Sequence, residues 1–328
     1  MKIITGILLL VTPLAAQLPR LTHANLQGRA VSGDPRADFD RSLAAQSGAA
    51  WFGYGVPMIA GENQMCHNRG LNTIASPVHL EGPRTLMVLY RMENHALTRI
   101  HVYSEDCELD AGGLPVTLLS GVKPSASVAL LASIARKPGE QKRTDEAITA
   151  IALHADSSAD DALEAMVKPD QDERLREKAV FWLGVTRGAR GYAAVKNVLT
   201  HDPSDKIREK AVFAMSLSKE PKSVADIIEV AKNDRSPHVR GQALFWLAQK
   251  AGKQATSAIA NSLENDPETE VKTKAVFALQ QLPKDEGVPL LIQTARNNRN
   301  PEVRKQAMFW LGQSNDSRAL AFFESVLK

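Results

Sequence analysis

Residues 178–183 read Lys-Ala-Val-Phe-Trp-Leu, and close variants of this phrase return at a constant spacing along the second half of the chain. The copies are Lys-Ala-Val-Phe-Ala-Met at 210–215, Gln-Ala-Leu-Phe-Trp-Leu at 242–247, Lys-Ala-Val-Phe-Ala-Leu at 274–279 and Gln-Ala-Met-Phe-Trp-Leu at 306–311. A constant period of this size indicates a solenoid, in which each unit buries its apolar face against the next. Such an array favours a binding function over a catalytic one.

Each repeat is predicted to be a helical hairpin. In the first clear copy, Leu175, Ala179, Trp182 and Leu183 have the spacing of an apolar stripe on one helix, and a second helix is expected from about 192 to 199. Proline suits the first turn of a helix but not its interior, so prolines between the copies mark where one repeat closes and the next begins. These prolines are Pro169, Pro203, Pro237, Pro267 and Pro301.

The phrase and the residues before it resemble the HEAT-repeat family, in particular short bacterial units such as those of phycobilisome-lyase-like proteins. The shared pattern is an aliphatic residue followed by a basic one, an alanine four positions after the aliphatic residue, and a leucine or methionine four positions later. The aliphatic and basic pairs are Leu175-Arg176, Ile207-Arg208, Val239-Arg240, Val271-Lys272 and Val303-Arg304. The resemblance covers about 145–328 and implies an α-solenoid that binds proteins.

A sixth, degenerate copy precedes the five clear ones. Ala147 to Ile151 lies one period before Ala179, although Arg143-Thr144 replaces the aliphatic and basic pair. We expect this copy to be a capping repeat, with residues 127–136 as its first helix.

The chain before the repeats has the alternation of β-strands. Strands are expected near 51–58, 85–91, 97–104 and 115–119, with a hairpin turn at Glu93-Asn94-His95 and a short helix near 37–46. We therefore expect a mainly α protein. A HEAT-like α-solenoid of about six 32-residue helical hairpins at 124–328 follows a small β-rich domain at 17–123.

Residues 1–16 have the character of an export signal. Lys2 supplies a positive charge, Ile3 to Leu14 form an apolar run, and Ala15-Ala16 offers a cleavage site. The run is shorter than the roughly 20 residues of a spanning helix. The alternative is a buried N-terminal helix, which Pro13 would interrupt. We expect a bacterial protein exported to the periplasm or the medium, with no stable membrane insertion after cleavage.

Export favours a disulfide between the two cysteines of the chain, Cys66 and Cys107. A metal site would instead recruit His67, Asp106 or Glu108, but zinc sites usually contain two closely spaced ligand pairs, and that pattern is missing. We expect a structural disulfide between Cys66 and Cys107, and we expect neither a metal nor an organic cofactor.

Charge and motifs favour a protein that is not an enzyme. Lys+Arg number 40 and Asp+Glu 37, an excess too small to indicate a nucleic-acid partner. The basic column from Arg176 to Arg304 is expected to form salt bridges with acids such as Asp172, Asp205 and Glu270 rather than a phosphate track. The diiron hydroxylases of HEAT architecture use His-Glu pairs, and this sequence contains none. The alternative is a hydrolytic or ligand-binding β-rich domain with the solenoid as a docking module.

Two positions of the phrase are candidates for binding and packing. Helical geometry puts the phenylalanine opposite the apolar stripe, on the face expected to be concave, where it either recognises a protein or peptide partner or packs against the next repeat. The next residue alternates between tryptophan and alanine, which suits interdigitated packing. The candidate partner-binding residues are Phe181, Phe213, Phe245, Phe277 and Phe309, and the candidate packing residues are Trp182, Trp246 and Trp310.

Overall fold

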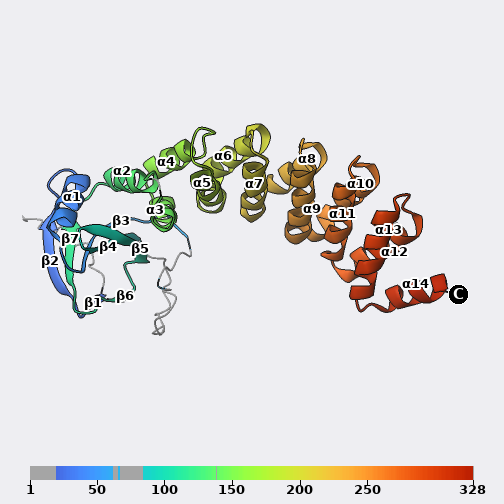
Figure 1. Cartoon of the computed structure of the whole chain (residues 1–328), viewed down its shortest axis with the longest axis horizontal. Helices are drawn as coiled ribbons and strands as arrows, with labels where there is room; N and C mark the ends of the chain where they lie inside the picture. The colour runs from blue at the N-terminus through green and yellow to red at the C-terminus, as the bar shows by residue number, and fades with distance from the viewer. Residues whose placement is uncertain (1–19, 62–65, 67–83, 138, 328) are drawn as a thin grey trace, which may run out of the picture. The chain divides into compact units, whose positions relative to one another are not determined.

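The computed structural model describes residues 20–61, 66, 84–137 and 139–327, which form two compact units (Figure 1). The first unit ends at Ile134 and also includes Leu153–Asp156, and the second consists of Ala135–Ala152 and the chain from Ser157 onward. The expected export signal lies outside the described residues. Of the helices that the structure describes, none has the length and apolar character needed to cross a membrane.

The first unit is built on a five-stranded sheet with the strand order β2-β7-β3-β4-β5. These strands are β2 (Asn25–Ala30), β3 (Ala50–Pro57), β4 (Thr85–Glu93), β5 (Ala96–Ser104) and β7 (Pro115–Ser120). The β3-β4-β5 part is antiparallel, whereas β7 runs parallel to both β2 and β3. A separate parallel pair and two helices complete the unit: β1 (Arg20–Thr22), β6 (Glu108–Asp110), α1 (Pro35–Ala45) and, up to Ile134, α2 (Pro124–Ala135).

The predicted hairpin at Glu93-Asn94-His95 joins β4 to β5. Asn94 and His95 have positive φ angles of 50° and 59°, as the turns that match the twist of a two-residue hairpin require. The four predicted strands are β3, β4, β5 and β7. The sequence did not predict β2, because this strand is exposed along its whole length and therefore lacks alternation between apolar and polar residues.

The second unit is a stack of helices in which odd-numbered and even-numbered helices alternate along the chain. In order they are α3 (Gln141–Leu153), α4 (Ser158–Met166), α5 (Glu173–Thr186), α6 (Gly188–His201), α7 (Asp205–Leu217), α8 (Ser223–Asn233), α9 (Pro237–Ala251), α10 (Thr256–Asn265), α11 (Thr269–Gln280), α12 (Lys284–Asn297), α13 (Pro301–Gln313) and α14 (Ser317–Leu327). A short 3-10 turn, η1 (Gly252–Ala255), links α9 to α10. The predicted fold class, a helical solenoid preceded by a β-rich region, is confirmed.

A helix is present where the first helix of the capping repeat was predicted. Ala147 to Ile151 lie in α3, which takes the place of a phrase-bearing helix. Residues 127–136 fall largely in α2, which precedes α3 and belongs up to Ile134 to the first unit. The alanine-rich sequence of α2 has the apolar character of a repeat helix, whereas α4 is short and has two aspartates in its first turn.

Candidate partner-binding face

The odd-numbered helices of the second unit form the layer that carries the repeated phrase. From α5 to α13, successive odd helices contact each other extensively, whereas successive even helices touch only lightly. Figure 1 shows α5, α7 and α9 side by side in this layer. A two-layered stack curves toward its more closely spaced layer. The odd helices therefore line the concave side of this unit.

The phenylalanines and tryptophans of the phrase form an unbroken line of rings, here called the aromatic row. Phe181 stacks on Phe213 with ring centroids 5.9 Å apart, and Phe245 stacks on Phe277 at 5.8 Å. Trp246 joins these two pairs, since its ring lies 4.6 Å from that of Phe213 and 4.8 Å from that of Phe245. The complete order is Trp182, Phe181, Phe213, Trp246, Phe245, Phe277, Trp310, Phe309.

The aromatic row combines packing between repeats with contact to solvent. Its rings are half-buried except for Phe309 at the end of the row, which is 53% exposed. One turn after Phe181 and Phe213, the side chains of Val185 and Leu217 are 39% and 44% exposed and widen the apolar surface. The result is a continuous, accessible apolar band along the concave layer.

The alternation of tryptophan and alanine follows from the geometry of the row. Ala214 and Ala278 are fully buried, and their helices carry no tryptophan to cover the neighbouring phenylalanine. The tryptophan of the next helix covers that ring instead: Trp246 lies over Phe213, and the Trp310 ring is 5.1 Å from that of Phe277. Two successive tryptophans would compete for one place. The alternation therefore lets Trp246 and Trp310 each contact rings on two helices.

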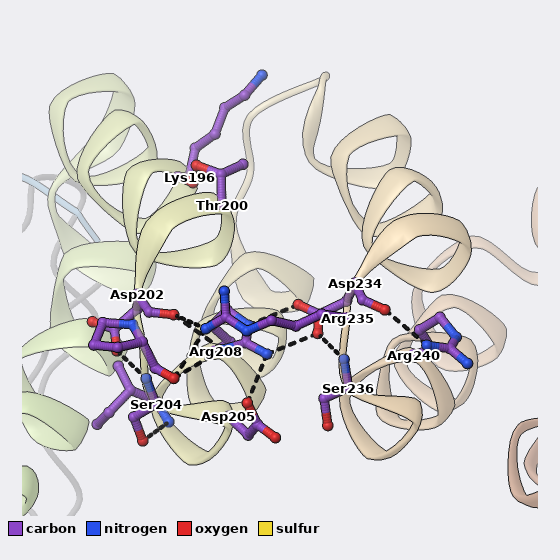
Figure 2. Close-up of polar contacts among 12 residues, drawn as sticks. Lys196, Thr200, Asp202, Ser204, Asp205, Arg208, Asp234, Arg235, Ser236 and Arg240 are labelled. Carbon is purple, nitrogen blue, oxygen red and sulfur yellow. Dashed lines mark hydrogen bonds and ion pairs between the residues drawn. The ribbon is translucent and has the colours of Figure 1, made fainter.

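A buried arginine lies beside the loops that join successive repeats (Figure 2). Arg208 is 1% exposed, and its Nε and Nη2 donate to the two carboxylate oxygens of Asp234 at 2.8 and 2.9 Å. Nη2 also donates to Asp205 Oδ1 at 2.8 Å, and Nη1 donates to the carbonyls of Asp202 and Pro203 at 3.0 and 3.4 Å. All five N–H groups of the guanidinium thus have acceptors.

The same arrangement recurs from repeat to repeat and is here called the arginine ladder. Each arginine binds the aspartate at the C-cap of the even helix of its own repeat. It also donates to the carbonyl at the C-cap of the preceding even helix, where the helix dipole favours a cation. The ladder consists of Arg176 with Asp202, Arg208 with Asp234, and Arg240 with Asp266.

The sequence predicted salt bridges for the basic column but not their principal partners. Of the acids expected within one helical turn, Asp205 does bind Arg208, whereas Asp172 caps α5 and Glu270 lies near His238. The ladder aspartates were missed because a whole helical hairpin separates each of them from its arginine in sequence. Their constant spacing, at positions 202, 234 and 266, was the signal that could have identified them.

The first unit contains a buried polar network that sequence reasoning missed. The hydroxyl oxygens of Tyr54 and Tyr90 are 2.6 Å apart, and Ser127 Oγ lies 2.9 Å from the Tyr54 hydroxyl and 2.8 Å from His154 Nε2. Burial raises the pKa of Tyr54 to about 12. A serine beside a histidine is the geometry of an activated nucleophile, but all four side chains have no exposed surface. The network therefore joins β3, β4, α2 and the segment at His154 rather than serving a substrate.

Cys66 and Cys107 form a disulfide with their Cα atoms 5.3 Å apart, the pairing that the sequence favoured. Asp106 brings a carboxylate oxygen within 4.8 Å of both sulfurs, which is the cluster that a metal site would have used. Both sulfurs are bonded to each other here, so this cluster lacks thiolate ligands. The bond joins positions with a sequence separation of 41, which contributes roughly 3–4 kcal/mol in the chain-entropy model.

Comparison with known proteins agrees with this architecture. The family model for HEAT repeats matches residues 192–279 and 256–328, so the second unit contains HEAT repeats. No curated protein matches the chain significantly in sequence. Similar solved structures include human deoxyhypusine hydroxylase in complex with glycerol, with 20% identity, a TM-score of 0.28, and coverage of 61% of this chain and 77% of that one.

Two further solved structures show the same kind of likeness. The complex of the two subunits of phycocyanin lyase from Nostoc has 18% identity and a TM-score of 0.33, with coverage of 61% of this chain and 80% of that one. Kap95p, in a structure with RanGDP, has 17% identity and a TM-score of 0.38, with coverage of 58% of this chain and 30% of that one. Similarity at this level carries no argument about function.

Proposed function

We propose that the protein is a non-catalytic exported scaffold, which binds a protein or peptide partner along the aromatic row of its HEAT solenoid. The observation that carries this proposal is the row itself. An exposed contiguous apolar surface on a soluble unit usually marks an interaction site, and buried aromatic anchors dominate binding energy at such sites. HEAT repeats generally present their concave layer to partners.

Two features support export. Residues 1–16 have the charge, apolar run and small residues of a secretory signal. The disulfide between Cys66 and Cys107 is of the kind that persists in oxidising compartments. Both features fit a bacterial protein that works in the periplasm or outside the cell.

The proposal is tested by substituting rings of the row in the full-length protein. Phe309→Ser removes the most exposed ring, and Phe245→Ser removes a central one. The control is Phe323→Ser, a half-buried phenylalanine on the even helix α14. Affinity capture from an envelope fraction, with mass spectrometry and a thermal melt of each variant, should show partner loss for the first two variants only. Undiminished capture by folded Phe245→Ser and Phe309→Ser proteins would rule out binding along the row.

A further inference from the structure

A pocket of about 230 Å³, here called the junction pocket, lies between the repeat of α11 and α12 and the end of α13. Its apolar part consists of side chains that are at most 5% exposed, namely Leu279, Leu282, Val288 and Leu291. A dry apolar cavity of about 150 Å³ is large enough to hold benzene. The junction pocket therefore has room for a side chain of the size of leucine.

The junction pocket is open because position 314 holds a short side chain. One period earlier the position is Leu282, which is buried. Two periods earlier it is Lys250, whose Nζ donates to two carbonyls at the end of α7 at 2.8 and 2.7 Å. Ser314 donates instead to the carbonyl of Leu311, three residues before it, at 2.7 Å. A serine thus lines the pocket at the position where the two preceding repeats hold long side chains.

The rim of the junction pocket carries neutral amide side chains, which belong to Gln280, Gln313 and Asn315. In the part of the chain that the structure describes, the side-chain amides of Gln313 and Asn315 have no hydrogen-bond partner. Each of these amides can both donate and accept a hydrogen bond, as a peptide group does. The rim therefore complements the main-chain amides of a peptide.

The charges around the junction pocket are already matched. Among the described residues that line it, only Lys284 is charged. Hydrogen bonds from Arg318, and to a smaller extent the charge of Lys284, lower the pKa of Asp316, while Asp285 acts in turn on Arg318. Glu286, the next residue, accepts a hydrogen bond from α10 at 2.9 Å. Two cations thus face two carboxylates, so the pocket favours an uncharged ligand over an ionic one.

The junction pocket adjoins the aromatic row. Gln313 lies four positions after Phe309, the most exposed ring of the row, so the two side chains are neighbours on the surface of α13. We infer that a peptide partner bound along the row inserts an aliphatic side chain of leucine size into the junction pocket, while its main-chain amides pair with Gln313 and Asn315. This inference rests on the proposed function and adds to it a side-chain preference of the partner.

Three small probes test the pocket in the full-length protein. They are the N-acetyl, N-methylamide derivatives of leucine, alanine and aspartate, which share one peptide framework and differ only in the side chain. Ligand-detected NMR at about millimolar concentration should show about tenfold tighter binding of the leucine derivative than of the alanine derivative, because leucine buries more carbon atoms. The aspartate derivative is similar in size to leucine but charged, and it should bind no better than the alanine derivative.

A substitution at position 314 locates the binding. Ser314→Leu introduces the side chain that the preceding repeat has at this position and fills the pocket. It should weaken binding of the leucine derivative about tenfold and leave the melting temperature no lower. The matched control is Ser257→Leu, the same change at an exposed position of α10, which should bind like the original protein.

A second variant leaves the pocket open and removes the amides of its rim. Asn315 has a φ of 50°, which glycine adopts without strain, so Gln313→Ala with Asn315→Gly preserves the turn. This protein should bind the leucine derivative roughly fivefold more weakly, because the hydrogen bonds to the peptide framework are lost. Its preference for leucine over alanine should persist, since the apolar part of the pocket is unchanged.

Affinity capture of the partner separates the inference from the proposed function. Ser314→Leu should reduce capture several-fold, because the partner loses one anchor. If the leucine derivative binds no better than the alanine derivative, or binds Ser314→Leu equally well, while capture still depends on Phe309, the inference is overturned and the proposed function stands. Unchanged capture by Ser314→Leu would assign the pocket to a small molecule and would also overturn the inference. If capture is independent of Phe245 and Phe309, the proposed function fails and the inference fails with it.

Discussion

Lys272 and Asn298 occupy the positions that hold an arginine and an aspartate in the three pairs of the arginine ladder, so both members of one pair, or rung, are replaced together. Three repeats pair arginine with aspartate, but the fourth has lysine at the first position and asparagine at the second. Lysine cannot supply the bidentate fork of arginine, and a carboxylate that loses this fork in a buried place is costly. Lys272 instead donates to the Glu264 carbonyl at 3.0 Å. Asn298 keeps the loop hydrogen bond that the ladder aspartates make, by accepting from Asn300 N at 3.0 Å.

Restoring this rung should stabilise the solenoid only when both residues change. We expect the double substitution Lys272→Arg with Asn298→Asp to raise the free energy of unfolding by about 1–2 kcal/mol more than the two single substitutions do when their effects are added. The reason is that the new pair forms two parallel charge-assisted hydrogen bonds. Urea unfolding of the four proteins in a double-mutant cycle measures this coupling. The reverse cycle, Arg240→Lys with Asp266→Asn, is the control and should show coupling of similar size. Additive single effects at 272 and 298 would contradict the interpretation.

The tryptophans stabilise the packing of neighbouring phrase-bearing helices. Trp246 contacts rings on α7 and on its own helix α9, so it links two repeats. It is half-buried, and Trp246→Ala should therefore cost about 2 kcal/mol rather than the roughly 3–5 kcal/mol of a fully buried ring. Thermal and urea unfolding measure the loss. Trp246→Phe keeps a ring in place and should recover most of it, whereas an unchanged melt of Trp246→Ala would show that the row contributes no stability.

Helix pairs were predictable because their signal is repeated. Five copies of one phrase fixed the position of each odd helix, and a count of about 100° per residue put Phe245 and its equivalents opposite the buried alanines. The helix α4 and the strand β2 were missed, since the first is short and the second has no buried face. The contacts that join the rings into one row could not be predicted from the sequence, because they depend on the distance between neighbouring helices in the folded protein.

Folding raises the pKa of all four tyrosines of the chain. Burial raises the pKa of Tyr54 to about 12, and burial together with Tyr54 raises the pKa of Tyr90 well above its usual value. Burial also raises the pKa of Tyr103. Burial and the Asp226 carboxylate raise the pKa of Tyr192 to about 12. These four are the complete set of tyrosines in the sequence.

Alkaline titration should therefore separate the folded from the unfolded protein. A pKa that is raised by folding gives stability that is complete below the unfolded value of about 10 and is lost as the pH rises toward 12. For Tyr54 alone this amounts to about 3 kcal/mol. Tyrosinate absorbance should appear near pH 10 in urea and at higher pH in the native protein, because folding raises the pKa of every tyrosine. Native titration of any tyrosine near pH 10 would contradict the burial described for that residue.

The alternation of tryptophan and alanine sets how this solenoid can change in length. Removal of one repeat, such as α7 with α8, would bring the helix of Trp182 against the helix of Trp246, with two indole rings where the row accommodates one. Removal of two adjacent repeats would bring α5 against α11, which carries Ala278, and the order of large and small side chains would persist. Duplication and deletion can therefore lengthen or shorten the array without a mismatch only in steps of two repeats.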